Sequence, residues 1–99
     1  MKFGLNQKTI NKINSVFELH SQIEEVLIYG SRAKGNYREG SDIDITLIGK
    51  NIELSKINEN IDDLNTPYLF DISIFDKLDS KDLIEHINRV GKTFYKKVE

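Results

Sequence analysis

The sequence predicts an α/β domain in which helices cover a small β-sheet. Three observations lead to this prediction. Apolar residues recur at helical spacing in three long segments, short β-branched or aromatic runs separate those segments, and one run alternates strictly between apolar and polar side chains. The chain has 99 residues, which is enough for one domain with a single core, so we expect residues 1–99 to form one unit.

The first four predicted elements are a helix over residues 7–21, a strand over 26–29, a short helix over 31–38 and a strand over 42–48. The first helix carries apolar side chains three or four positions apart from Ile10 to Phe17. The first strand is a buried apolar run that ends at Gly30. The short helix opens at Ser31 and is interrupted at Gly35, and the second strand is the alternating run.

The later predicted elements are a helix over residues 54–65, a strand over 68–75, a helix that starts at 79 or 80, and a candidate edge strand over 93–95. Leu54, Ile57 and Ile61 give the first of these helices one apolar face. Ser80 suits the N-cap of the last helix, and Gly91 suits the left-handed C′ position that ends it.

Composition excludes several classes of function. The chain has no cysteine, which removes disulfides, thiolate catalysis and zinc fingers. No apolar run approaches the ~20 residues of a membrane span, the N-terminal segment lacks the apolar core of a signal peptide, and a cytoplasmic protein without membrane contact follows as the default. The net charge of −2 disfavours a direct nucleic-acid binder, which normally shows a basic face.

Carboxylates in two predicted strands are the informative anomaly. Asp42 and Asp44 are two residues apart in an alternating run, so both are expected on one face of the strand. Asp71 lies within the otherwise apolar run 69–74, where an unpaired carboxylate is costly. If these two strands are neighbours, the three carboxylates can converge into an oxygen-donor site of the kind that Mg²⁺ prefers.

A second feature precedes the acidic pair. Gly30 and Ser31 follow the first strand, where a glycine lets the backbone approach an anion closely and a serine offers both an N–H and a hydroxyl. Arg32 and Lys34 can add charge-assisted contacts to phosphate. The turn is not a Walker phosphate loop, because the spacing of that motif is absent.

Together, Gly30-Ser31, ten residues and Asp42-x-Asp44 resemble the Gly-Ser-x10-Asp-x-Asp signature of nucleotidyltransferases related to DNA polymerase β. The chain is most similar to the minimal nucleotidyltransferases, which are small prokaryotic members of that superfamily. The resemblance runs from Val26 to Tyr95 and implies the nucleotidyltransferase fold, an α/β (α+β) arrangement with a small mixed sheet of three or four strands covered by helices.

The resemblance also implies a function. Such proteins use ATP and two Mg²⁺ ions to place a nucleotide on an acceptor hydroxyl, and many are antitoxins that transfer AMP to a tyrosine of a HEPN-type RNase toxin encoded beside them. By this similarity Asp42, Asp44 and Asp71 bind the metals and carry catalysis, while Gly30 and Ser31 hold the triphosphate. A hetero-oligomer with the toxin is one implied assembly.

Two other functions stay open at this point. The chain can be a non-catalytic antitoxin that neutralises its partner by steric contact, or the catalytic subunit of a small-molecule nucleotidyltransferase. The presence of all three aspartates favours an enzyme over a purely steric antitoxin.

Four further features are expected to be structural. His20 reads as a core or rim residue, His86 as an exposed helix residue and Tyr37 as a loop aromatic, with base stacking as its functional alternative. The acidic residues around the second long helix, Glu53, Glu59, Asp62 and Asp63, are either a solvated face or a docking surface for a basic partner.

Overall fold

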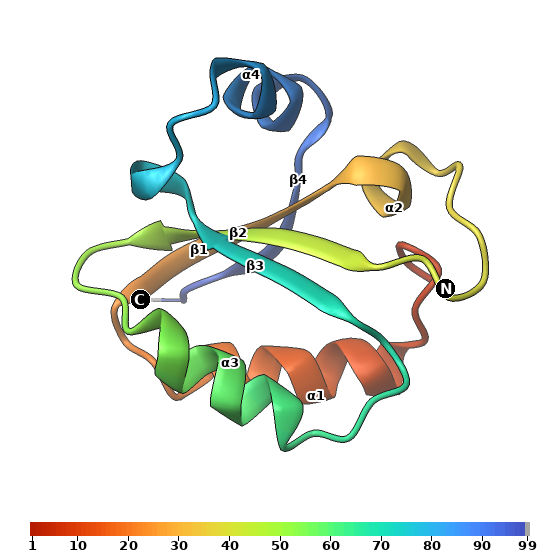
Figure 1. Cartoon of the computed structure of the whole chain (residues 1–99). Coiled ribbons are helices and arrows are strands. Elements are labelled where there is room, and N and C mark those ends of the chain that lie inside the picture. The colour runs from red at the N-terminus through yellow and green to blue at the C-terminus, as the bar shows by residue number, and fades with distance from the viewer. Residues whose placement is uncertain (99) are drawn as a thin grey trace.

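A four-stranded mixed sheet organises the chain, with helices packed on both of its faces (Figure 1). The computed structural model describes residues 1–98. The elements are α1 (Gln7–Glu18), β1 (Ile23–Tyr29), α2 (Gly30–Lys34), β2 (Ile43–Gly49), α3 (Leu54–Asp62), β3 (Phe70–Ile74), the 3₁₀ turn η1 (Phe75–Lys77), α4 (Lys81–Val90) and β4 (Lys92–Lys96). The predicted order of helices and strands is confirmed, including the edge strand near the C-terminus.

The strand order is β3-β2-β1-β4. Strand β1 pairs antiparallel with both β2 and β4, whereas β2 and β3 run parallel and are joined through α3. The expectation that the second and third strands are neighbours is therefore confirmed, and it is this parallel pairing that sets two carboxylates side by side.

The two faces of the sheet differ in chemistry. Alternate residues of β2, namely Ile43, Ile45 and Leu47, are fully buried and form the core with the apolar sides of α1 and α3. Helices α1 and α3 lie together on this face, and α4 lies on the opposite face (Figure 1). The intervening residues Asp44 and Thr46 consequently point to the α4 face.

Two helices begin with a side-chain N-cap, and the one at Ser80 was predicted from the sequence. The Asn6 side chain accepts a hydrogen bond from the Thr9 N–H at 2.8 Å and caps α1. The Ser80 hydroxyl accepts from the Leu83 N–H at 3.2 Å and caps α4, so Ser80 and not Asp79 is the N-cap.

Helix α1 is shorter than the periodicity predicts, because it ends at Glu18 and not at residue 21. The chain must turn there to bring Ile23, which is fully buried, into β1. His20 thus lies beyond the helix, half-buried, and its Nε2 is 2.9 Å from the Asn60 side-chain oxygen of α3. His20 was predicted to be a core or rim residue of the first helix; the structure places it at the rim, beyond the end of that helix.

Gly91 ends α4 for a different reason than predicted. Its φ of −61° is not left-handed, so the glycine does not serve the expected C′ conformation. A Cβ at this position would instead collide with the Ile87 carbonyl oxygen, to which the Gly91 N–H donates at 2.7 Å. A close backbone approach, and not a positive φ, explains the glycine.

Within residues 1–98, none of the helices combines the length and the apolar character needed to cross a bilayer.

Candidate active site

A row of polar side chains crosses three strands on the α4 face of the sheet. Asp44 of β2 lies opposite Tyr29 of β1 on one side and opposite Asp71 of β3 on the other. Asp44 and Asp71 are paired in the parallel register, and neighbouring strands lie about 4.7–4.9 Å apart, so the two carboxylates are adjacent on one face of the sheet. We call Asp44 and Asp71 the acidic pair.

The third predicted carboxylate, Asp42, lies just before β2, which begins at Ile43 and not at residue 42. Asp42 is exposed and follows a tight turn in which the Ser41 N–H donates to the Arg38 carbonyl at 3.0 Å. Its charge still reaches Asp44, because it contributes to the electrostatic environment of that carboxyl group. Asp42 therefore borders the acidic pair from the loop side.

Gly30 brings the backbone against the acidic pair. It begins α2 directly after β1 and has φ of +71°, a conformation that glycine adopts without penalty. A Cβ at Gly30 would lie 2.5 Å from Oδ2 of Asp44, which is closer than such atoms approach. A side chain at Gly30 would displace the Asp44 carboxylate from the turn, and the positive φ would strain the backbone of any other residue.

Ser31 follows in the first turn of α2 and is half-buried. The helix has a single turn and stops at Gly35, which is left-handed with φ of +89° and whose N–H donates to the Ser31 carbonyl. The predicted short helix and its interruption at Gly35 are confirmed, although the helix does not extend to residue 38. The Gly30–Ser31 turn thus lies next to the acidic pair.

Arg32 occupies a different environment from the one that phosphate binding requires. Only 3% of its surface is exposed. Its Nε and one terminal nitrogen donate to the Ser41 carbonyl at 3.0 and 2.8 Å, and the other terminal nitrogen donates to the Phe3 carbonyl at 2.9 Å. The guanidinium carbon is also 5.5 Å from the centre of the Tyr37 ring and 5.0 Å from that of Tyr68.

Arg32 is consequently a brace between the N-terminal turn and the loop that leads to Asp42. Because Arg32 holds the Ser41 carbonyl, it restrains the position of the backbone from which the Asp42 side chain extends. Tyr37 is 38% exposed and covers the guanidinium, which agrees with the prediction of a loop aromatic.

Lys34 lies exposed at the end of α2, in a hollow that it shares with Lys2 of the N-terminal segment and Lys92 of β4. Strand β4 is on the opposite edge of the sheet from β3, which carries Asp71. The structure therefore does not bring Lys34 to the acidic pair.

The electrostatics of the acidic pair follow from its crowding. Burial raises the pKa of Asp44 above its usual value, and the neighbouring Asp71 and Asp42 carboxylates raise it further, while the Arg32 guanidinium opposes the shift. Burial also raises the pKa of Tyr29, and the Asp71 and Asp44 carboxylates add to this rise, while the nearby Ser73 side chain opposes it. A bound cation would relieve the repulsion between the carboxylates.

The donor chemistry fits a hard cation such as Mg²⁺, since adjacent carboxylates with access to water are the ligands it prefers. In residues 1–98, however, no three acidic or histidine side chains are already gathered closely enough to form a metal-binding group. The acidic pair is set by the strand register, whereas Asp42 would have to turn its exposed side chain toward it.

His86 is the residue of this region that sequence reasoning missed. It was expected to be exposed, which is wrong, because it is half-buried and its Nε2 accepts a hydrogen bond from the Gly30 N–H at 3.2 Å. The periodicity of α4 gives the face of each residue but not the place where the helix crosses the sheet, so the sequence offered no signal for a contact between positions 56 residues apart.

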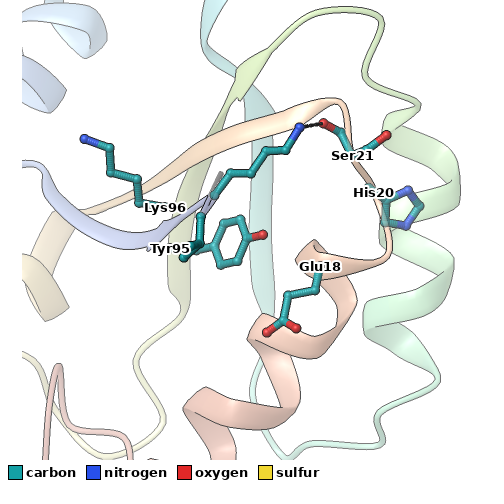
Figure 2. A pocket seen from close by; sticks show the side chains of 7 residues that line it. Glu18, His20, Ser21, Tyr95 and Lys96 are labelled. Atoms are coloured by element: carbon teal, nitrogen blue, oxygen red, sulfur yellow. Dashed lines mark hydrogen bonds between the residues drawn. The ribbon is translucent and has the colours of Figure 1, made fainter.

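A separate hollow of about 380 Å³ lies at the other end of β1 (Figure 2). Glu18, His20, Ser21 and Tyr95 line it, and the Lys97 ammonium donates to the Ser21 carbonyl at 3.0 Å. The Lys97 N–H bonds to the Glu24 carbonyl, five residues and roughly 17 Å along the strand from Tyr29. The hollow is therefore distinct from the candidate active site.

Comparison with known proteins identifies the family to which the chain belongs. Residues 11–99 match the family described as Polymerase beta, Nucleotidyltransferase. The match covers most of the chain, and the protein belongs to this family. No curated protein matches the sequence.

Solved structures add the same fold from toxin–antitoxin complexes. A chain of a toxin–antitoxin complex with AMP-PNP matches with a TM-score of 0.70 and 19% identity, covering 89% of this chain and 73% of that chain. A chain of a MntA–HpeT complex, in which two aspartates two positions apart are changed to glutamate, matches with a TM-score of 0.70 and 18% identity. The match covers 94% of this chain and 75% of that chain. A chain of the complex between the tri-AMPylated Shewanella oneidensis HEPN toxin and MNT antitoxin matches with a TM-score of 0.65 and 16% identity. The match covers 94% of this chain and 74% of that chain.

The Asp44→Asn variant is expected to raise the melting temperature of the metal-free protein near neutral pH. The raised pKa of Asp44 means that the folded chain binds this proton more tightly than the unfolded chain, so the free energy of unfolding falls as pH rises through that pKa. At about pH 3, below the ordinary aspartate pKa, Asp44 is protonated in both the folded and the unfolded chain, so the increase in melting temperature should vanish. Thermal unfolding in EDTA at about pH 7 and about pH 3 measures both effects. A lower melting temperature for the variant at neutral pH would contradict the crowding described here.

The Arg32→Lys variant is expected to lose about 2–4 kcal/mol of stability, because lysine cannot reach both carbonyls with a planar fork. Lys34→Met, two residues away and exposed, serves as the control and should change stability by less than about 0.5 kcal/mol. Urea unfolding measures both. Equal stabilities for the two variants would show that Arg32 is not a brace.

Proposed function

We propose that this chain is a Mg²⁺- and ATP-dependent nucleotidyltransferase that acts as an antitoxin by transferring AMP to a tyrosine hydroxyl of a HEPN-type RNase toxin. The observation that carries the proposal is the acidic pair lying beside the Gly30–Ser31 turn, with the backbone so close to Asp44 that a side chain at Gly30 would displace its carboxylate. Carboxylates beside a bare backbone turn are suited to hold a metal-bound triphosphate.

The comparisons support the choice of class and partner. The family match is to nucleotidyltransferases. The similar solved chains come from toxin–antitoxin complexes, one with AMP-PNP and one with a tri-AMPylated HEPN toxin. In another, the two residues changed are aspartates with the same spacing as Asp42 and Asp44. ATP as the nucleotide and a HEPN-type toxin as the acceptor are the corresponding proposals for this chain.

The metal ligands in this proposal are Asp42, Asp44 and Asp71. When bound, Mg²⁺ neutralises charge on the phosphates and on the leaving group, and two ions are the number that the resemblance implies. The crowded Asp44 carboxyl group must be ionised to bind metal, so the metal and the proton compete for it.

The chain's own residues have separate tasks in the transfer. Gly30 and Ser31 hold the triphosphate, for which the half-buried Ser31 supplies an amide and a hydroxyl. Asp71 is exposed at the edge strand β3, where an acceptor can reach it, and orients the tyrosine hydroxyl and takes its proton. The tyrosine oxygen forms a bond to the α-phosphorus while the bond to the pyrophosphate oxygen breaks, so pyrophosphate leaves and AMP stays on the acceptor.

The geometry also favours one surface for the acceptor. The acidic residues of α3, such as Glu59 and Asp62, are exposed but belong to the helix on the other face of the sheet from the acidic pair (Figure 1). A toxin docked there would present its tyrosine on the wrong face. In this proposal the acceptor approaches from the α4 face and the β3 edge, and the acidic face of α3 is a solvated surface.

The combined Asp42→Asn and Asp44→Asn variant is expected to lower AMP transfer to the co-expressed toxin by more than about a hundredfold, because the metal ligands lose their charge. The charge-matched control replaces the exposed Asp76 and Asp79, which lie beyond the far end of β3, with asparagine and should transfer at the wild-type rate. Transfer is followed with ATP labelled at the α-phosphate and by the AMP mass shift on a toxin tyrosine.

Labelling at the wild-type rate by the Asp42/Asp44 variant would overturn the assignment of the site. A toxin that this variant binds and neutralises equally well without modification would instead show a steric antitoxin.

A further inference from the structure

His86 connects α4 to the turn of the candidate active site. It lies in the second half of α4, is half-buried, and its Nε2 accepts the Gly30 N–H at 3.2 Å. Its ring also meets the Tyr29 ring edge-on, with centroids 6.0 Å apart and planes at 82°. Neither contact has a role in the transfer described above.

The hydrogen bond sets the tautomer of the neutral imidazole ring, and the Tyr29 contact sets the orientation of the ring. A ring nitrogen that accepts a hydrogen bond carries no proton, so Nδ1 carries the proton of the neutral ring. The Tyr29 ring, which is itself 94% buried in the strand face, limits the rotation of the imidazole. His86 therefore presents one acceptor in a defined direction.

The group that this acceptor holds is the amide of a residue with wide conformational freedom. Gly30 has no side chain to limit its backbone, and its positive φ is one of several conformations open to glycine. The Asp44 carboxylate lies against this residue, and Ser31 follows it directly. A rotation at Gly30 would move the Ser31 amide and change the gap between the turn and the acidic pair.

We propose that His86 is a positioning residue of the nucleotide site, which holds the Gly30 amide and thereby keeps the Gly30–Ser31 turn in the shape that binds the triphosphate. The inference rests on the proposed function, because it assigns His86 to the same site. It also refines that site: the Gly30 N–H is engaged by protein, so the Ser31 amide and hydroxyl are the donors left in this turn for phosphate. Preorganisation of this kind strengthens binding because less conformational entropy is lost when the ligand binds, and it adds no contact to the ligand.

Three substitutions separate an acceptor from bulk or charge. Gln at position 86 can place its side-chain oxygen where Nε2 lies, whereas Asn is polar but too short to reach Gly30. Phe keeps a ring against Tyr29 and has no acceptor. The matched control is His20→Phe, since the other histidine of the chain contacts Asn60 at the opposite end of β1.

The first measurement follows the Gly30 amide in the nucleotide-free protein by ¹⁵N NMR. Loss of its acceptor is expected to speed hydrogen exchange of this amide by about tenfold in His86→Asn and His86→Phe, with His86→Gln and His20→Phe close to wild type. Unchanged exchange in both His86→Asn and His86→Phe would overturn the contact. This readout needs no activity, so it stands even if the chain transfers no nucleotide.

The second measurement is the KM for Mg-ATP in the toxin AMPylation assay. His86→Asn and His86→Phe are expected to raise KM by about threefold to tenfold, the range of one hydrogen bond, while His86→Gln stays within about twofold of wild type. Equal loss in Gln and Asn would overturn the acceptor role, and so would a wild-type KM in an Asn variant with fast Gly30 exchange. If His86→Phe does not fold, the Gln and Asn pair decides alone. An inactive wild-type protein with the expected exchange pattern would refute the proposed function and not the contact.

Discussion

The close approach of Gly30 to Asp44 is the constraint on which the site depends. A Cβ at Gly30 would lie 2.5 Å from the Asp44 Oδ2 atom, so a side chain at this position would displace the carboxylate from the turn. The positive φ of Gly30 adds a second reason for glycine, since it redirects the chain from β1 into the single turn of α2. Backbone and carboxylate thereby meet at one point of the sheet.

The rest of the fold maintains that meeting. The register of β1 against β2 sets Tyr29 opposite Asp44, and the parallel pairing of β2 with β3 brings Asp71 to the other side. The buried residues on the opposite face of β2, packed on α1 and α3, fix this register, because a slip by one residue would turn Asp44 into the apolar core. Arg32 holds the loop before Asp42 through the Ser41 carbonyl, and His86 of α4 contacts the Gly30–Ser31 turn.

Sequence reasoning predicted the parts of this arrangement that depend on local pattern. The alternation around Asp44, the isolated Asp71 and the spacing from Gly30 predicted the order of the elements and the carboxylates of the site. It failed where a contact between distant residues decides the role. Arg32 beside the Gly-Ser turn was expected to contact phosphate, yet its guanidinium donates to the Phe3 and Ser41 carbonyls. His86 reaches Gly30 only because α4 crosses the sheet at that point.

The central claim is that a cation binds at the acidic pair beside the Gly30–Ser31 turn. Paramagnetic broadening tests it directly, because Mn²⁺ accepts the same carboxylate ligands as Mg²⁺ and broadens the amide signals nearest to it. With AMP-PNP and a small amount of Mn²⁺, the account predicts that the amides of Ser31, Asp44 and Asp71 broaden first, while those of α3 across the sheet stay sharp. Broadening centred on the acidic residues of α3, or on the hollow at the other end of β1, would contradict it.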